Sequence, residues 1–252
     1  MSGHSKWASI KHKKAATDAR RGQLFTKLAR AITVAAREGG GDPDANFTLA
    51  AAIEKAKSFS MPKDNIQRAI DRGTGAGDAG AQIERVVYEG YGPGGAAILV
   101  DALTDNRNRT SAELRHAFDK NGGSLGEPGS VAWQFERKGV VIVDASRYGE
   151  EDLLAAIDAG ADDVVADGDL LKATADPASL TAVSEALAES GVEVQSAELL
   201  MEPKTVVEVT AENEVRALMR LMDSLDDHDD VEAVHANFDI PAELLEEAEA
   251  AA

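Results

Sequence analysis

The sequence predicts an α+β protein in which an N-terminal three-helix domain is followed by two ferredoxin-like domains, one inserted into the other. Three observations support this. Apolar residues recur with the helical period up to residue 72, and a glycine-rich run covers residues 73–80. Strand and helix patterns then alternate. Among these, residues 139–200 follow a complete βαββαβ order, and an incomplete half of a second such unit lies on each side.

The helical part contains three amphipathic segments. In residues 23–37, apolar side chains including Leu28 and Ile32 form one stripe, whereas the basic side chains project from another face. Leu49, Ile53 and Ala56 mark a second helix. Ser60 is a candidate N-cap for a third helix that ends at Gly73. The run GTGAGDAG then predicts a flexible linker.

In the alternating part, residues 96–103 are expected to form a strand and residues 111–120 a helix, with Thr110 and Glu113 as a capping box. Val131, Trp133 and Phe135 predict one face of a second strand. The insert has strands at 139–143, 163–166, 169–174 and 193–200 and helices at 150–159 and 177–189, the second helix capped by Asp176. A strand at 205–209, a helix at 214–225 and a strand at 231–238 then complete the outer unit.

These patterns predict four segments of the chain. Residues 1–76 form a basic helical domain with an N-terminal arm, 81–137 plus 203–240 a discontinuous α+β domain, 138–202 the inserted domain, and 241–252 an acidic tail. The alternative is two independent α+β domains that divide the chain elsewhere, because boundaries inferred from sequence err by about two to four residues.

Charge is distributed unevenly along the chain. The net charge is -19, from 26 Lys and Arg against 45 Asp and Glu, yet residues 1–72 hold 14 basic and 7 acidic side chains. One end could therefore bind polyanions while the remainder repels them.

The chain has no cysteine, which excludes disulfides and thiolate-bound metal. Without a secretory apolar run or a membrane-length segment, we expect a cytoplasmic protein.

The first candidate site is the N-terminal arm, where no acid interrupts the basic residues. Its cations could neutralise phosphates while Trp7 stacks on an unpaired base. The alternative is a solvated terminus with Trp7 packed into the helical domain. The candidate nucleic-acid-binding residues in the arm and the first helix are His4, Ser5, Lys6, Trp7, Lys11, His12, Lys13, Lys14, Arg20, Arg21, Lys27 and Arg30.

The second candidate site is the loop from Thr104 to Thr110, between a strand and a helix N-terminus. Free backbone amides at such a position favour an anion, and Arg107 and Arg109 flank them. The alternative is a capped loop with two exposed arginines.

Patterns typical of enzymes and metal sites are not found in the sequence. The five histidines lack zinc-ligand spacing, and the glycines of residues 90–95 precede a strand, whereas a dinucleotide-binding loop follows one. The acidic run around His228 lacks the glycine and distal glutamate of a calcium loop, so we expect a solvated turn there. We therefore expect no catalytic residue, no metal and no cofactor.

Three motifs resemble one known family. Gly3-His4-Ser5-Lys6-Trp7 followed by Ile10-Lys11-His12-Lys13-Lys14 is similar to the N-terminal motif of the YebC/PmpR family. Tyr88-Glu89-Gly90-Tyr91-Gly92-Pro93 and Thr104-Asp105-Asn106-Arg107-Asn108-Arg109-Thr110 resemble its internal motifs, and Gly129-Ser130-Val131 falls where the family has it. The resemblance implies a helical domain, two nested α+β domains, a cytoplasmic location and no catalytic activity.

The same resemblance implies one of two roles, either a DNA-binding transcriptional regulator or a translation factor that acts on the ribosome. A duplex DNA reader usually presents a recognition helix, and no helix-turn-helix spacing is evident here. A cationic arm with one aromatic suits structured RNA, while the acidic body limits binding elsewhere. The sequence therefore favours ribosomal RNA as the partner over duplex DNA; an enzyme remains a formal third option, and the oligomeric state is left open.

Overall fold

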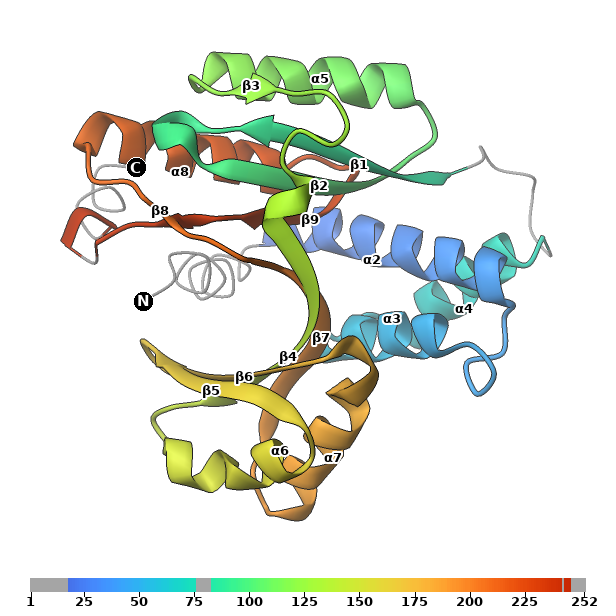
Figure 1. Cartoon of the computed structure of the whole chain (residues 1–252). Helices are drawn as coiled ribbons and strands as arrows, with labels where there is room; N and C mark the ends of the chain where they lie inside the picture. Colours follow the sequence, from blue (N-terminus) through green and yellow to red (C-terminus); the bar gives the residue numbers. More distant parts are fainter. Residues whose placement is uncertain (1–17, 76–82, 242, 246–252) are drawn as a thin grey trace.

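The computed structural model describes residues 18–75, 83–241 and 243–245, without the side chains of residues 18–21 and 167. A group of helices lies beside two lobes, each of which contains a four-stranded sheet (Figure 1). Within the described part of the chain, no helix is long and apolar enough to cross a membrane.

Three helices form the first group. Their bounds are α2 (Asp18–Gly39), α3 (Phe47–Ser58) and α4 (Lys63–Gly73). The predicted apolar stripes are confirmed, because Leu28, Ile32, Leu49 and Ile53 are buried together in one core. The predicted N-cap at Ser60 is wrong. Pro62 takes that position, and Ser60 closes α3 in a left-handed conformation with φ of 59°.

The lower lobe in Figure 1 is the inserted domain, and its βαββαβ order is that of a ferredoxin-like fold. Its strands lie in the order β5-β6-β4-β7, and all neighbours are antiparallel. Their bounds are β4 (Phe135–Asp144), β5 (Ala161–Asp167), β6 (Leu170–Ala175) and β7 (Val194–Pro203). The helices are η3 (Glu150–Leu153), α6 (Leu154–Asp158), η4 (Pro177–Ser179) and α7 (Leu180–Glu189). The Asp176 carboxylate accepts from the Ala178 N–H at 2.9 Å, which confirms the predicted cap.

The upper lobe contains the sheet β3-β1-β2-β9, in which β9 follows the inserted domain and pairs with β2. This pairing excludes two independent domains, because the second half of the chain completes the sheet begun by the first. The elements are β1 (Glu84–Tyr91), η1 (Pro93–Gly95), β2 (Ala97–Thr104), α5 (Arg107–Lys120), β3 (Ser124–Leu125), α8 (Glu212–Asp226) and β9 (Val231–Ala236). Both long helices pack on one face of the sheet, where Phe118, Leu218 and Met222 are buried with Ile98.

In this lobe one strand was not predicted, and another is shorter than predicted. Strand β1, which was not predicted, occupies the position of the third strand of a ferredoxin-like sheet. It does so because the turn at Gly92 folds β1 back onto β2, and the Gly92 N–H donates to the Ala96 carbonyl at 2.7 Å. The predicted strand at 205–209 is reduced to β8 (Val207–Glu208), which pairs outside the main sheet with β10 (Phe238–Asp239).

The segment predicted as a strand at 131–135 is also different. Residues Ala132–Gln134 form the short helix η2, and Trp133 is exposed whereas Val131 and Phe135 are buried. The backbone amides there are bound by the Glu89 carboxylate, so they need no neighbouring strand. The strand that pairs with β1 on the edge away from β2 is β3.

A long two-stranded ribbon joins the lobes. Strands β4 and β7 run between the upper and lower lobes in Figure 1, and their pairing extends from Val143 and Val194 to Phe135 and Pro203. At the upper end, Phe135 packs with Ala97 and Leu99 on the sheet face opposite the helices. The inserted domain is therefore anchored to the upper lobe by an apolar contact at the upper end of the ribbon.

Candidate nucleic-acid interface

The arm that was predicted to bind nucleic acid lies outside the described residues. This applies to His4, Ser5, Lys6, Trp7, Lys11, His12, Lys13 and Lys14. Arg20 and Arg21 belong to helix α2, but their side chains are not described. The choice between a base-stacking Trp7 and a packed Trp7 therefore stays a prediction.

The basic face of α2 contacts the upper lobe of the protein itself. The Lys27 ammonium donates to the Asp226 carbonyl. The Arg30 guanidinium donates to the carbonyls of Leu103 and Asp229 at 3.3 and 2.9 Å. The sequence predicted a separate basic face on this helix. At Lys27 and Arg30, that face is an intramolecular interface between the helical domain and the upper lobe.

Asp230 is the centre of that interface. Its carboxylate is 3% exposed and accepts from Arg30 at 2.5 Å, from Arg109 at 2.5 Å and from the Thr110 hydroxyl at 2.6 Å. Arg30 comes from α2, Arg109 from α5 and Asp230 from the turn after α8, so three elements far apart in sequence meet at one carboxylate. We call Arg30, Arg109, Thr110 and Asp230 the Asp230 cluster. The prediction of a solvated turn is wrong at Asp230.

The pKa of Asp230 reflects this environment. Burial raises it, but the hydrogen bonds from Thr110 and Arg109 and the charge of Arg30 outweigh burial and lower the pKa to about 2. The carboxylate is consequently ionised throughout the physiological range. Removal of the cationic partners is therefore expected to destabilise the protein strongly, because it leaves a buried charge uncompensated. Of the two arginines, Arg30 is the one that reaches Asp230 from the helical domain.

The loop from Thr104 to Thr110 differs from its prediction in several respects. Helix α5 begins at Arg107, four residues before the expected start, and Asn106 is its N-cap, with the side-chain oxygen accepting from the Arg109 N–H at 3.1 Å. Thr110, expected as the cap, is buried inside the helix. Both arginines lie near acids: Arg107 is 3.7 Å from Glu84 and 60% exposed, whereas Arg109 belongs to the Asp230 cluster.

These positions predict opposite outcomes for the two arginines. Arg107→Ala should leave the melting temperature unchanged and weaken nucleic-acid binding by about 1 to 3 kcal/mol, the effect of losing one charge-assisted contact to a phosphate. Arg109→Ala should lower the free energy of unfolding by about 1 to 2 kcal/mol, a value reduced because the guanidinium is 43% exposed. Urea denaturation and filter binding of both variants test this. A destabilised Arg107→Ala protein would contradict it.

His228 lies beside the Asp230 cluster and could suggest a metal site. Glu113, His228 and Asp230 offer ligand atoms within 4.8 Å of one another in the described part of the chain. However, His228 Nδ1 accepts from the Asp230 N–H at 3.1 Å, and Nε2 lies 3.0 Å from the Glu113 carboxylate. The Asp230 oxygens already bind two guanidinium groups, whose positive charge opposes a cation. We interpret the three residues as a hydrogen-bond network.

Glu89 has a structural role that its sequence context did not predict. Its buried carboxylate accepts from the N–H groups of Gly129, Val131 and Ala132 at 2.6, 2.7 and 2.7 Å. Burial raises the pKa of Glu89, but these three bonds together lower it further, so the pKa lies below its ordinary value. The bonds physically connect two of the family-like motifs. Glu89 is one of two acids in β1, and its local sequence does not distinguish it from the exposed Glu84.

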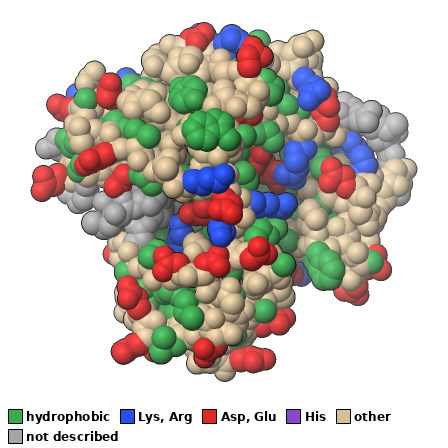
Figure 2. Space-filling model, in the orientation of Figure 1, with side chains coloured by type: hydrophobic (Ala, Val, Ile, Leu, Met, Phe, Trp, Pro, Cys, Tyr) green, Lys and Arg blue, Asp and Glu red, His purple; other side chains and the backbone are tan. Residues whose placement is uncertain are grey.

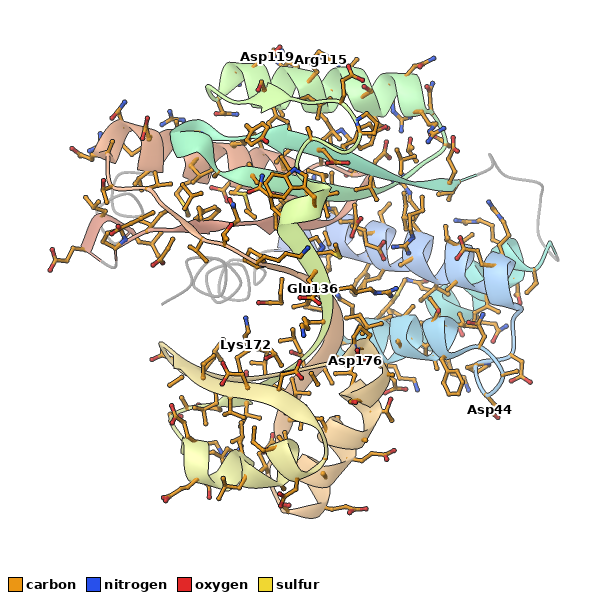
Figure 3. The ribbon with its side chains drawn as sticks, viewed as in Figure 1. Asp44, Arg115, Asp119, Glu136, Lys172 and Asp176 are labelled. Atoms are coloured by element: carbon orange, nitrogen blue, oxygen red, sulfur yellow. The ribbon has the colours of Figure 1, made fainter. Side chains whose placement is uncertain are left out.

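The open face of the inserted sheet lacks the groups that ferredoxin-like domains use to bind RNA. Since Val141 and Val143 face the helices, the alternate residues of β4, with their partners on β6 and β7, form the other face. This face carries charged side chains including Glu136, Lys172 and Glu202. It has no aromatic for base stacking, because the single aromatic of these three strands, Phe135, is buried against the upper lobe. Figure 3 shows Glu136 and Lys172 between the lobes, and Arg115 on the outer side of α5.

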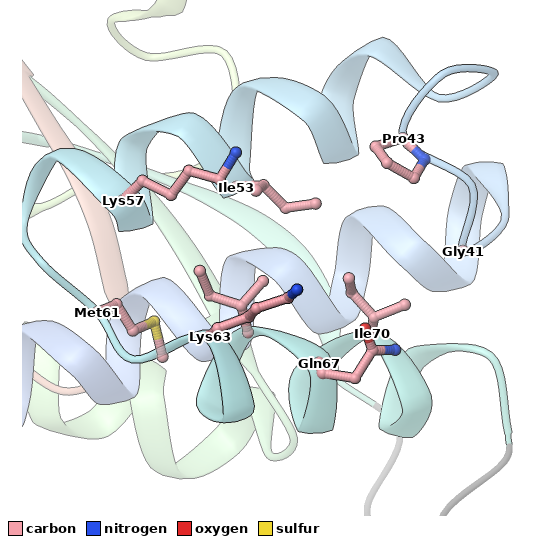
Figure 4. Close-up of a pocket in the computed structure, with 9 residues that line it drawn as sticks. Gly41, Pro43, Ile53, Lys57, Met61, Lys63, Gln67 and Ile70 are labelled. Atoms are coloured by element: carbon pink, nitrogen blue, oxygen red, sulfur yellow. The ribbon is translucent and has the colours of Figure 1, made fainter.

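A groove lies between α3 and α4 in the helical domain (Figure 4). Apolar side chains such as Ile53, Met61 and Ile70 line it, and Lys57 and Lys63 stand beside them. None of its nine lining residues is a carboxylate or an imidazole, so the groove offers no acid-base pair for catalysis.

Charged side chains of both signs gather where the two lobes meet, and hydrophobic side chains lie on the upper lobe above them (Figure 2). The described structure thus defines a class of protein: a helical domain joined to two nested ferredoxin-like domains through an ionic cluster around the buried Asp230. Comparisons with known proteins identify the family within this class.

The chain belongs to the TACO1/YebC family. The family model for the TACO1/YebC protein N-terminal domain matches residues 5–76, and that for the TACO1/YebC second and third domain matches residues 83–238. The predicted membership of the YebC/PmpR family is therefore confirmed.

Similar full-length proteins include a probable transcriptional regulatory protein of Rubrobacter xylanophilus, 56% identical over 98% of this chain and 99% of the relative. A protein of the same description from Halothermothrix orenii is 53% identical over 98% of each chain. Among solved structures, a conserved hypothetical protein from Aquifex aeolicus has a TM-score of 0.86 and 47% identity, covering 95% of this chain and 99% of the other.

Proposed function

We propose that the protein is a non-enzymatic, nucleic-acid-binding regulator of gene expression that acts in the cytoplasm as a translation factor and binds ribosomal RNA through its N-terminal arm. The observation that carries this proposal is the charge distribution. Residues 1–72 hold 14 basic and 7 acidic side chains in a chain whose net charge is -19. Polyanion binding is therefore expected at the arm and repulsion along the rest of the chain.

The described contacts support the arm as the main cationic surface. Lys27, Arg30 and Arg109, which the sequence offered as phosphate ligands, bind the carbonyls and the carboxylate of the upper lobe. Among the candidate cations, the arm lysines, Arg20, Arg21 and Arg107 therefore remain for an external phosphate.

The second candidate is a DNA-binding transcriptional regulator, and the descriptions of the relatives favour it. Duplex binding would normally require a recognition helix at the major groove. Helix α2 is the most basic helix by sequence, but its Lys27 and Arg30 are held against the upper lobe. This arrangement favours RNA over duplex DNA.

The arm can be tested by salt dependence. Replacing Lys6, Lys11, Lys13 and Lys14 by Gln should reduce the slope of log affinity against log salt by roughly 0.7 to 0.9 for each phosphate that a lysine no longer neutralises. Ribosomes and duplex DNA serve as the two ligands. A larger loss of ribosome binding in the arm variant would indicate a translation factor, and a larger loss of DNA binding would indicate a transcriptional regulator. The melting temperature should stay constant, because we expect the arm lysines to be solvated, and solvated lysines contribute little to folding.

A charge-matched control uses four exposed cations elsewhere. This control variant changes the net charge by the same amount as the arm variant, through replacement by Gln of Lys57, Lys63, Arg115 and Lys120. Its slope of log affinity against log salt should nevertheless stay at the wild-type value. If the arm variant binds both ligands as well as the wild type, the proposed function is wrong.

A further inference from the structure

Two aromatic side chains are exposed side by side on the upper lobe. Trp133 is 67% exposed and Tyr91 is 37% exposed. The Tyr91 hydroxyl and the Trp133 indole N–H both donate to the Ser130 carbonyl, at 3.0 and 3.1 Å. Since both polar hydrogens are already bonded, the ring faces are what these residues offer to a partner.

The loop that carries Trp133 is held firmly. Its amides at Gly129, Val131 and Ala132 bind the buried Glu89 carboxylate. The neighbouring Val131 and Phe135 are buried against the sheet. Fixing an aromatic in place before binding reduces the entropic cost of association, so the loop presents Trp133 in a form suited to stacking.

Positive charge accompanies the two rings. The Lys204 ammonium donates to the Trp133 carbonyl at 3.0 Å, and Arg137 is exposed four residues further along the chain. Within the described residues, neither forms an ion pair with a carboxylate. Of the nearby acids, Glu89 is bound by three amides and Glu202 by Lys172, while Glu127 and Glu136 are exposed.

We propose that Tyr91 and Trp133 form a stacking surface for unpaired bases of a single-stranded nucleic acid, with Lys204 contacting an adjacent phosphate. The inference rests on the proposed function and adds a second contact region far along the chain from the arm. Aromatic rings stack on bases of any sequence, but only where the bases are unpaired. This chemistry selects single-stranded segments and excludes intact duplex DNA.

Fluorescence provides a direct test, because the chain contains two tryptophans. In a Trp7→Phe protein, Trp133 is the single tryptophan, and a single-stranded octamer of uridine should quench its emission on binding. In the otherwise wild-type protein, Trp133→Ala should weaken octamer binding about 5- to 150-fold without changing the salt slope. Trp133→Phe should retain most of the affinity, and Lys204→Gln should reduce the slope by roughly 0.7.

The matched control is Phe47→Ala, since Phe47 is an 87% exposed aromatic on α3 that has no part in the surface. It should bind as the wild type does. Trp133→Ala and Phe47→Ala should both keep the wild-type melting temperature, because neither Trp133 nor Phe47 is buried. If Trp133→Ala binds as tightly as Phe47→Ala while the arm variant still changes the salt slope, the stacking surface is wrong and the proposed function stands.

Two further results would also overturn the stacking surface. One is octamer binding without quenching of Trp133. The other is quenching by an uncharged peptide but not by the octamer, which would make this a peptide-binding surface. If the wild-type protein binds neither the octamer nor ribosomes, the stacking surface and the proposed function fail together.

Discussion

Replacing Arg30 and Arg109 together by alanine is expected to lower the free energy of unfolding by about 3 to 5 kcal/mol. The double variant leaves the Asp230 carboxylate, 3% exposed, with the Thr110 hydroxyl but without either cation. Each single variant should cost less than half as much, because one guanidinium still compensates the charge. The two destabilisations should therefore be non-additive, which a double-mutant cycle with urea denaturation measures.

The pH dependence of stability gives an independent check. The pKa of Asp230 is lowered to about 2 in the folded protein, from an ordinary value of 3.8. A lowered pKa contributes stability that is fully present above the ordinary value and is lost as pH falls from about 4 towards 2. The difference in stability between wild type and double variant should therefore shrink over that window. A difference that stays constant would show that the cluster does not act through Asp230.

Arg147→Ala is the control for this experiment. Arg147 pairs with Glu193 at 2.5 Å, but both side chains are more than half exposed. Exposed pairs contribute about 0 to 1 kcal/mol, so this variant should remain close to wild type. An equal destabilisation in the control and in the double variant would mean that burial of Asp230 is irrelevant.

Glu89→Ala is expected to lower the free energy of unfolding by roughly 2 to 4 kcal/mol, because three amides lose one shared acceptor. Glu89→Gln should have an intermediate effect, since the amide oxygen still accepts but the charge is removed. The pKa of Glu89 is lowered in the folded protein from its ordinary value of 4.5. The Glu89 carboxylate therefore contributes to the free energy of unfolding above pH 4.5, and this contribution declines as the pH falls below that value. Urea denaturation at pH 7 and pH 4 measures both effects.

The Glu89 variant should also loosen the loop that carries Trp133. Fluorescence anisotropy of Trp133 in the Trp7→Phe background should fall in Glu89→Ala at a temperature where the protein stays folded. Glu127→Ala is the matched control, because Glu127 is an exposed acid of the same loop. If both variants have the same stability and the same anisotropy, the carboxylate does not hold the loop.

Much of the architecture was predictable from local patterns. The stripes of α2 and α3, the cap at Asp176 and the order of the inserted domain follow from side-chain periodicity and turn chemistry, which depend on residues near in sequence. The predictions failed where a partner lies far along the chain. The segment 131–135 looked like a strand, but a carboxylate more than 40 residues away binds its amides.

For the candidate site, the sequence by itself determined the uneven charge, the family motifs and which residues could meet a phosphate. It could not determine which of these cations are available, because a basic face looks the same whether it meets nucleic acid or an acid of the same chain. Only the tertiary structure brought Arg30 and Arg109 to Asp230, over separations of 200 and 121 residues, and left Arg107 exposed. Burial in three dimensions made Asp230 a partner for two arginines, while its sequence context, an acidic turn, gave no sign of it.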